Sequence, residues 1–387
     1  MIPYGRKSVS QEDIDQVVQV LRSDYLTQGP VVPQFESAVA TYCGAVHAVA
    51  TNSATAALHV ACLALGVGPG DQVWTSPTTF VASANCAVYC GAEVDFVDID
   101  PQTYNMSVAR LTEKLVQARD NGTLPKVLIP VHLCGQSCDM QGIHALSREF
   151  GFRVLEDASH AIGGRYSDQP VGSCRYSDIT VFSFHPVKII TTGEGGMALT
   201  NDPLLAKLMR QYRSHGITSD RDEMESRAAD EIWNYQQVRL GYNYRMTDIH
   251  AALGLSQMGR LDEFVLARHQ IAATYDRELA DLPITTPLQL ESTYSSYHIY
   301  PIRISRELCG NGQREVFQAL HAAGVLVNLH YIPVYRQPFF ERMGFSAGYC
   351  PEAERYHRET LSLPMYPALS AAQQQKVIAA LKEALAI

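Results

Sequence analysis

The chain has 387 residues, of which 46% are hydrophobic and 18% charged, a composition typical of a globular protein with a large core. The formal net charge of −9 argues against a basic nucleic-acid-binding face, and no apolar run reaches the roughly 18 residues that a membrane span needs. Nine scattered cysteines are typical of reduced thiols, and the first residues lack the apolar core of a signal peptide, so we expect a cytoplasmic protein.

In chain order, a capping-box pattern at Ser10–Asp13 first predicts a helix near the N-terminus. Short apolar runs then alternate with amphipathic segments. The predicted strands lie at 48–50, 72–75, 93–97, 127–131, 153–156, 179–184 and 197–199. The predicted helices lie at 55–65, 81–89, 108–117, 140–150 and 203–214. This alternation predicts an α/β fold with a mostly parallel sheet covered by helices, and a ligand at the carboxyl ends of the strands.

The pattern changes after about residue 250. A long helix is predicted at 251–282, followed by a strand at 297–304, a helix at 313–323, a strand at 325–330 and a helix at 371–386. We therefore predict a large domain at 1–250, which includes the N-terminal arm, and a smaller α+β C-terminal domain at 251–387.

Lys188 stands in an apolar segment without an adjacent acid. A buried, unpaired ammonium is costly, so such a lysine tends to lose its charge, as a Schiff-base nucleophile must. Asp157 follows a predicted strand, and Lys188 lies four residues beyond the end of another, so both can enter one crevice. An acid and a desolvated lysine are what pyridoxal phosphate needs. The alternatives are a lysine that reaches to solvent and an aspartate that caps a strand end.

The segment 51–57 joins a predicted strand to a predicted helix and is rich in hydroxyl groups. Free N–H groups at a helix start bind phosphate, although Ser53 or Thr55 could equally be an ordinary cap. His132, Cys134 and Cys138 lie close together, but no second pair at zinc-site spacing follows, and we expect no metal.

Four motifs, EDASHA at 156–161, SFHPVK at 183–188, GEGG at 193–196 and GYNYRMTD at 241–248, resemble the DegT-type sugar-nucleotide aminotransferases. The resemblance covers nearly the whole chain and implies the fold type I of pyridoxal-phosphate-dependent transferases. The segments 26–30, 74–77, 80–85 and 330–335 resemble members that act in pseudaminic acid biosynthesis. Those members aminate a UDP-linked 4-keto-6-deoxy-N-acetylhexosamine with L-glutamate as donor.

The resemblance implies roles for individual residues. Lys188 matches the catalytic lysine, and Asp157 matches the partner of the pyridine nitrogen. The remaining cofactor contacts that it implies are Ala54, Thr55, Phe80, His160, Ser183 and Asn243, the last reaching in from the neighbouring subunit of a homodimer. For the sugar nucleotide it implies Tyr4, Asp24, Tyr25, Leu26, Thr27, Asn328, Leu329, His330 and Tyr331. Core packing for Phe80, a buried core position for His160 and a turn for Asn243 are the alternative interpretations.

Lysine at position 188 argues against the family members that dehydrate sugars and carry histidine there. A different 4-keto or 3-keto nucleotide sugar remains an alternative acceptor. A non-catalytic regulator would have lost the lysine or the acid, and a nicotinamide-dependent oxidoreductase would carry a glycine fingerprint, which we do not find.

Overall fold

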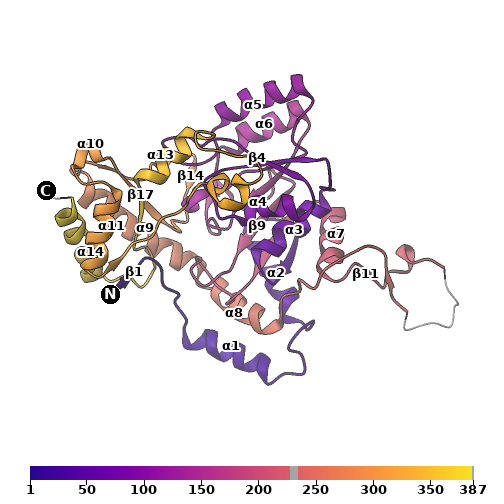
Figure 1. Ribbon diagram of the computed structural model, residues 1–387. Coiled ribbons are helices and arrows are strands. Elements are labelled where there is room, and N and C mark those ends of the chain that lie inside the picture. Colours follow the sequence, from indigo (N-terminus) through magenta and orange to yellow (C-terminus); the bar gives the residue numbers. More distant parts are fainter. Residues whose placement is uncertain (227–233, 386–387) are drawn as a thin grey trace.

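The computed structural model describes residues 1–226 and 234–385. A seven-stranded sheet lies at the centre of the larger part (Figure 1). Its strand order is β2-β10-β9-β6-β5-β3-β4, and every neighbouring pair is parallel except the two that contain β10. The strands are β2 (His47–Thr51), β3 (Gln72–Thr75), β4 (Glu93–Phe96), β5 (Val127–Ile129), β6 (Arg153–Asp157), β9 (Ile179–Ser183) and β10 (Gly196–Thr200). The predicted α/β class with a mostly parallel sheet is confirmed.

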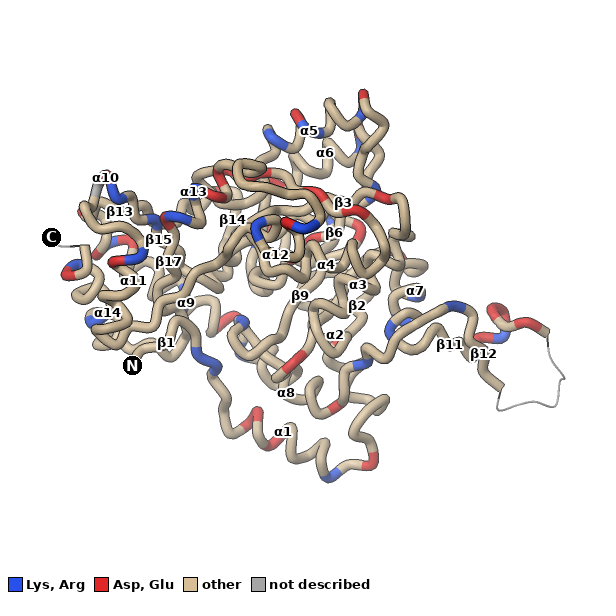
Figure 2. The backbone as a smooth tube through the Cα atoms, viewed as in Figure 1, with Lys and Arg blue, Asp and Glu red and all other residues tan. Residues whose placement is uncertain are grey.

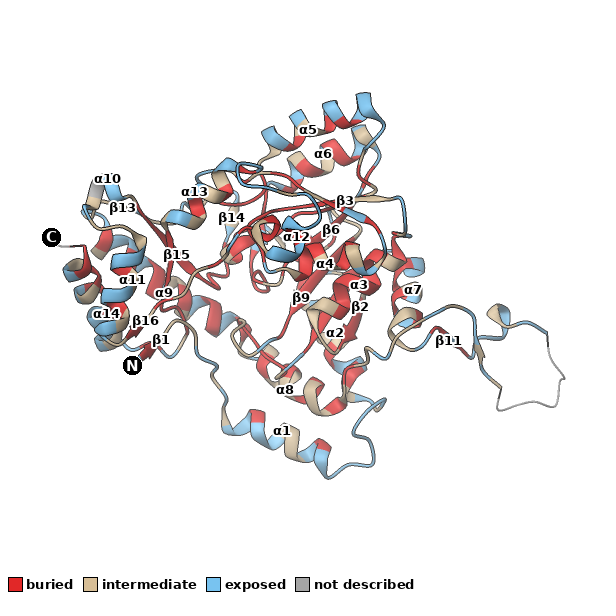
Figure 3. Cartoon of the chain, in the orientation of Figure 1, coloured by how far each residue is buried: buried red, intermediate tan, exposed pale blue. Residues whose placement is uncertain are grey.

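Helices cover both faces of this sheet, so most residues of its strands are buried (Figure 3). The helices are α2 (Val31–Cys43), α3 (Ala54–Ala64), α4 (Ala82–Tyr89), α5 (Val108–Asn121), α6 (Met140–Phe150), α7 (Pro203–Arg213) and α8 (Asp248–Met258). Side chains alternate between two cores: Val181 packs with α3 and α4, and Phe182 packs on the opposite face with α2 and α8. No helix of the described chain combines the length and the apolar character that a membrane crossing requires.

A second core lies beside the large sheet and contains a small antiparallel sheet. Its strand order is β13 (Ile284–Thr285), β15 (Tyr300–Ile304) and β17 (Thr360–Leu363). The helices α9 (Leu261–Leu279), α11 (Gln313–Ala322) and α14 (Ala371–Ala384) pack on it. The first residues reach this part too, because β1 (Ile2–Pro3) pairs in parallel with β16 (Val325–Leu326). The predicted domain boundary at residue 250 falls inside α8 and stays a prediction, and the predicted end at 387 lies outside the described residues.

The remaining elements are short or peripheral. The first helix, α1 (Gln11–Leu21), begins with the predicted capping box at Ser10. A hairpin of β11 (Ile217–Thr218) and β12 (Gln236–Gln237) projects away from the rest of the chain and carries charges of both signs (Figures 1 and 2). The others are β7 (Arg165–Tyr166), β8 (Gln169–Pro170), β14 (Thr293–Tyr294), α10 (Arg306–Cys309), α12 (Pro338–Glu341), α13 (Pro351–Glu359) and 3₁₀ turns at Leu133–Gly135, Arg221–Glu223 and Val334–Arg336.

The single long helix predicted at 251–282 is wrong. Two helices, α8 and α9, meet there, because Gly259 is a poor helix former and Arg260 leaves the helical region at φ −116°, ψ 9°. The predicted C-terminal helix is present but is described only to Ala384, and its last predicted residue, Ala386, lies outside the described residues.

The sequence pattern missed α2, whose start is fixed from a distant part of the chain. Its first N–H groups, those of Val31 and Val32, donate to the buried carboxylate of Asp248 at 2.8 and 3.0 Å. The N–H of Gly29 donates to the same carboxylate at 2.7 Å. A cap that lies more than 200 residues away leaves no local signal.

Arg268 on α9 binds two other segments of the C-terminal part. Its buried guanidinium Nη1 donates to the carbonyls of Tyr297, His298 and Met365 at 3.0–3.2 Å. Burial lowers the pKa of Arg268 to about 9. We expect Arg268→Ala to lower the free energy of unfolding by about 3 kcal/mol, because three buried carbonyls lose a charged donor. Urea denaturation measures this loss. Arg277→Ala, at an exposed position of the same helix, serves as the control, with a loss below about 0.5 kcal/mol; equal losses would contradict the assignment.

Candidate active site

A cavity of about 450 Å³ opens at the carboxyl ends of the parallel strands, between the large sheet and the segment 328–331. It brings together most of the residues that the sequence singled out. The predicted residues that line it are Tyr4, Ala54, Thr55, Phe80, Asp157, His160, Ser183, Lys188, Asn328, Leu329, His330 and Tyr331.

Lys188 lies in the turn that follows β9, where its N–H donates to the carbonyl of His185 at 2.9 Å. Its side chain enters the cavity. Burial lowers the pKa of Lys188 to about 8, and the nearby Asp157 carboxylate opposes part of that fall. An amine with this pKa can both accept and donate a proton near neutral pH.

Asp157 is the last residue of β6, and its carboxylate faces the same cavity. Ser83 Oγ donates to Oδ2 at 2.6 Å, and the N–H of Ser159 donates to Oδ1 at 3.1 Å. Both carboxylate oxygens therefore have a donor inside the protein, which fixes the plane of the group. A buried, oriented carboxylate is suited to hold a protonated ring nitrogen.

The start of α3 forms an anion cradle at one end of the cavity. Ser53 caps the helix by accepting from the N–H of Ala56 at 3.1 Å, so Ala54 and Thr55 occupy its first turn. Gly196 pairs with Ser183 on β9, and a Cβ at Gly196 would lie 2.5 Å from the Ala54 nitrogen. Glycine at this position therefore keeps the first turn of α3 open beside Ser183, as a phosphate group requires.

His160 lies between the cavity and the segment 328–331. Its Nδ1 accepts from the N–H of Cys134 at 3.3 Å, so the single proton of the neutral ring sits on Nε2 and is donated to Tyr331 Oη at 3.2 Å. Burial, Lys188 and His330 hold the pKa of His160 well below its usual range. The imidazole is therefore a neutral hydrogen-bonding group rather than a second cation.

Phe80 lies at the opening of the cavity just before α4, and the residue is 59% exposed. The core position that sequence alone allowed for Phe80 is therefore wrong. An exposed aromatic face beside Asp157 and Lys188 is available to stack on a planar ring.

The N-terminal arm and the segment 328–331 form one wall. Pairing of β1 with β16 brings Tyr4 to His330, with ring centroids 5.3 Å apart. His330 Nδ1 lies 2.8 Å from Ser362 Oγ, and burial lowers its pKa to about 4. Burial raises the pKa of Tyr331, because it disfavours the charged form of the hydroxyl. This wall presents neutral aromatic and hydroxyl groups, which suit a sugar ring.

The other predicted residues, Asp24–Thr27 and Asn243, do not line the cavity of their own chain. All of them are exposed, and Asp24–Thr27 lie against the segment that follows Asn243, because the N–H of Asp248 donates to the carbonyl of Leu26 and Thr27 bridges to Thr247. Their predicted roles therefore need a neighbouring subunit and stay predictions.

Ser83 and His298 also contact or line the site, although neither was predicted from the sequence. Ser83 could have been found, because it lies three residues after Phe80 and so one helical turn away. His298, whose ring centroid lies 4.4 Å from that of His160, has no motif around it. Within the described chain, no group of three or more His, Cys, Asp or Glu side chains could hold a metal.

Comparison with known proteins gives the class. Residues 7–382 match the model of the DegT/DnrJ/EryC1/StrS aminotransferase family. The chain is 37% identical to the spore coat polysaccharide biosynthesis protein SpsC of Bacillus subtilis, over 99% of this chain and 96% of that protein. It is 35% identical to the UDP-4-amino-4,6-dideoxy-N-acetyl-beta-L-altrosamine transaminase of Campylobacter jejuni, over 95% and 93%. The chain therefore belongs to the DegT/DnrJ/EryC1/StrS aminotransferase family.

The solved structures agree. The aminotransferase PseC of Helicobacter pylori, involved in the biosynthesis of pseudaminic acid, superimposes with a TM-score of 0.90 at 30% identity, covering 100% of this chain and 99% of that one. The PLP form of the sugar aminotransferase Spr1654 of Streptococcus pneumoniae gives 0.88 at 30% identity, covering 100% and 98%. The chain is a sugar aminotransferase that uses pyridoxal 5′-phosphate, and the lysine, carboxylate and anion cradle of the cavity fit that cofactor.

Lys188 should leave a signature on the stability of the apoprotein. Its folded pKa of about 8 lies below that of an unfolded lysine, near 10.5, so the unfolded state binds more protons between these pH values. The lysine therefore costs stability below pH 8, and this cost disappears as the pH rises to about 10.5. We expect Lys188→Met to be more stable than the wild type at pH 7, with an advantage that shrinks by about 2 kcal/mol between pH 8 and 10.5. Urea denaturation across this range measures it, and a constant difference would contradict the assignment.

Proposed function

We propose that the enzyme transfers the amino group of L-glutamate to C4 of a UDP-linked 4-keto-6-deoxy-N-acetylhexosamine, a step of pseudaminic acid biosynthesis. The observation that carries this proposal is the cavity itself. It places a lysine with a pKa of about 8 and an oriented carboxylate next to an anion cradle and a neutral aromatic wall. The similarity to the Campylobacter jejuni transaminase and to PseC supports the choice of sugar.

Each of the main cavity residues has a role that follows from its position. Bound pyridoxal phosphate supplies an electron sink for the carbon that loses its proton. Asp157 holds the proton on the pyridine nitrogen, and Ser183, Ala54 and Thr55 hold the phosphate. Lys188 Nζ takes a proton from the α-carbon of glutamate in the first half-reaction and delivers one to C4 of the sugar in the second.

The sugar nucleotide extends from this point along the wall of Tyr4 and residues 328–331. Hydroxyl and imidazole groups there accept and donate hydrogen bonds to sugar hydroxyls, while the rings of Tyr4 and Tyr331 cover its apolar faces. The wall contributes no full positive charge of its own, because burial keeps His330 neutral.

A second subunit completes the site in this proposal. Asn243 and Asp24–Thr27 are exposed and do not line the cavity of their own chain. Among these residues Tyr25 is 57% exposed, and Leu240, close to Asn243 in the sequence, is 74% exposed. Large apolar side chains left exposed in this way are typical of a protein–protein contact. We therefore assign this face to the homodimer, with Asn243 reaching the phosphate of the neighbouring site.

A different acceptor is the alternative that the relatives support. SpsC is at least as similar to the chain as the Campylobacter jejuni transaminase, and its name specifies no sugar. A different 4-keto or 3-keto nucleotide sugar would use the same lysine and the same carboxylate, so only direct comparison of acceptors separates the two assignments.

The reaction can be followed in halves by the absorbance of the bound cofactor. We expect glutamate alone to bleach the visible band, and the UDP-linked 4-keto-6-deoxy-L-N-acetylhexosamine to restore it faster than any other UDP- or dTDP-linked keto sugar. Faster recovery with another sugar would overturn the pathway and leave the enzyme class intact. Failure of glutamate to bleach the band would overturn the donor.

Lys188→Ala should slow both half-reactions by about 10²–10⁴-fold or more, because a positioned acid–base group contributes a factor of this size. Rapid mixing with glutamate and then with the keto sugar measures the two rates separately. Lys376→Ala, at an exposed position of α14, is the matched control and should leave both rates unchanged. Wild-type rates in Lys188→Ala would contradict the assignment of Lys188 as the acid–base group.

Hybrid dimers test the shared site. Asn243→Asp places a negative charge beside the phosphate and should inactivate the homodimer, as Lys188→Ala does. A hybrid of the two variants contains one site with both native residues, so subunit exchange should recover about a quarter of the wild-type activity. No recovery, with hybrids demonstrated by mass spectrometry, would show that Asn243 does not act across the dimer.

A further inference from the structure

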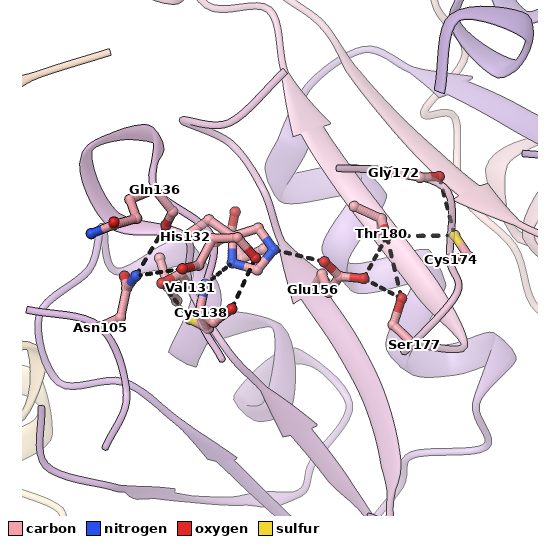
Figure 4. A network of polar contacts seen from close by, with 12 residues as sticks. Asn105, Val131, His132, Gln136, Cys138, Glu156, Gly172, Cys174, Ser177 and Thr180 are labelled. Carbon is pink, nitrogen blue, oxygen red and sulfur yellow. Dashed lines mark hydrogen bonds and ion pairs between the residues drawn. The ribbon is translucent and has the colours of Figure 1, made fainter. Parts of the chain in front are cut away.

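A buried polar cluster surrounds Glu156, the residue next to Asp157 in the sequence (Figure 4). Glu156 precedes Asp157 on β6, so its side chain points to the opposite face of the sheet, away from the cavity. Its carboxylate accepts from His132 Nε2 at 2.6 Å, from Thr180 Oγ1 at 3.1 Å and from Ser177 Oγ. Burial raises the pKa of Glu156, but these donors outweigh burial and hold the pKa below its usual range, so the group keeps its charge.

His132 is fixed at both of its ends. Its backbone N–H donates to the carbonyl of Asp157 at 3.1 Å, and its Nδ1 accepts from the N–H of Cys138 at 3.1 Å. Burial alone would lower the pKa of His132, but Cys138 and Glu156 outweigh burial and raise the pKa to about 10. Nδ1 already faces the Cys138 N–H, so the proton that points at the Glu156 carboxylate is the one on Nε2. His132 therefore donates to Glu156 through Nε2–H.

These contacts form a closed loop of hydrogen bonds around the peptide that joins Glu156 to Asp157. The β9 ladder holds one side of that peptide, with Asp157 opposite Val181. On the other side the regular β5 ladder ends earlier, at Leu128 and Val154. Beyond that point the N–H of Asp157 donates to the Pro130 carbonyl at 2.9 Å, and its carbonyl accepts from His132. The imidazole of His132 then donates to the Glu156 carboxylate, which closes this loop of contacts.

We propose that His132 and Glu156 are positioning residues that aim the Asp157 carboxylate at the pyridine nitrogen of pyridoxal phosphate. The inference rests on the proposed role of Asp157. Apolar side chains would hold two strands together without the cost of burying a carboxylate, but they would not fix a direction. Hydrogen bonds depend on angle, so the pair fixes the orientation of the peptide from which the Asp157 side chain extends. The charge of Glu156, on the reverse of the same strand, adds to the field that favours a protonated ring nitrogen.

The test uses the holoenzyme, with two readouts that do not involve turnover. These are the dissociation constant of pyridoxal phosphate and the pH midpoint at which the visible absorbance of the resting enzyme changes. Both are measured well below the melting temperature of each variant. His132→Phe keeps a planar ring without donors, His132→Gln keeps an N–H near the position of Nε2, and Glu156→Gln keeps the size of the side chain and removes its charge.

We expect His132→Phe and Glu156→Gln to weaken cofactor binding several-fold and to raise the pH midpoint by about 0.5 unit, which corresponds to about 0.7 kcal/mol. In these variants the pyridine nitrogen holds its proton less firmly. Its positive charge then repels a proton on Lys188 Nζ less strongly, so the pH midpoint rises. His132→Gln should restore both values toward the wild type. Cys174→Ser is the matched control: its sulfur contacts Thr180 Oγ1 at 3.4 Å at the edge of the cluster, and both readouts should stay unchanged.

Lower melting temperatures with an unchanged dissociation constant and midpoint would overturn the inference and leave His132 and Glu156 with a role in stability alone. If His132→Phe does not fold, the isosteric Glu156→Gln decides by the same two readouts. Asp157→Asn separates this inference from the proposed function. A midpoint that moves in Asp157→Asn but in neither His132→Phe nor Glu156→Gln overturns only the inference. A midpoint that stays fixed in Asp157→Asn overturns the role of Asp157 itself.

Discussion

Parallel pairing of β6 with β9 is the constraint on which the active site depends. The register places Asp157 opposite Val181, so both strands end at one edge of the sheet and the turn after β9 returns Lys188 toward the carboxylate. The same edge is buried deeply enough to lower the pKa of the lysine. The antiparallel strand β10 then brings Gly196 next to Ser183, which leaves room at the start of α3. Carboxylate, amine and anion cradle thus follow from the order of three neighbouring strands.

Strands, helices and site residues that depend on consecutive residues could be predicted from the sequence. The strands around Asp157 and Lys188 and the helix after Ser53 lie within a few residues of their predicted bounds, because their apolar periods and caps are local. The chemistry of consecutive residues likewise pointed to Asp157, Lys188 and the segment 51–57. Resemblance supplied His160, Ser183, Tyr4 and residues 328–331, the last two of which β1 and β16 bring to the cavity from opposite ends of the chain.

The features that escaped depend on long-range contacts. Helix α2 is capped by Asp248, and Ser83 reaches Asp157 across 74 positions. The break before α9 is the exception, because its cause at Gly259 and Arg260 is local but the apolar pattern continues through it. His298 enters the cavity wall because Arg268 binds its carbonyl, and nothing in its own neighbours indicates this. Asn243 and Asp24–Thr27 illustrate the opposite case, since a motif identified them but a single chain leaves them outside its own cavity.

Helix α9 has a further consequence for how the pocket opens. Its first turns place Leu261, Phe264 and Val265 in a core of the large sheet, and its later turns place Ile271, Tyr275 and Leu279 in the core of the small sheet. Rotation of one core against the other would have to bend this continuous helix or strip side chains from one of the cores, and both are costly. The width of the cavity is therefore built into the subunit. Substrates therefore enter a preformed cleft, in which rearrangement falls to the side chains that line it.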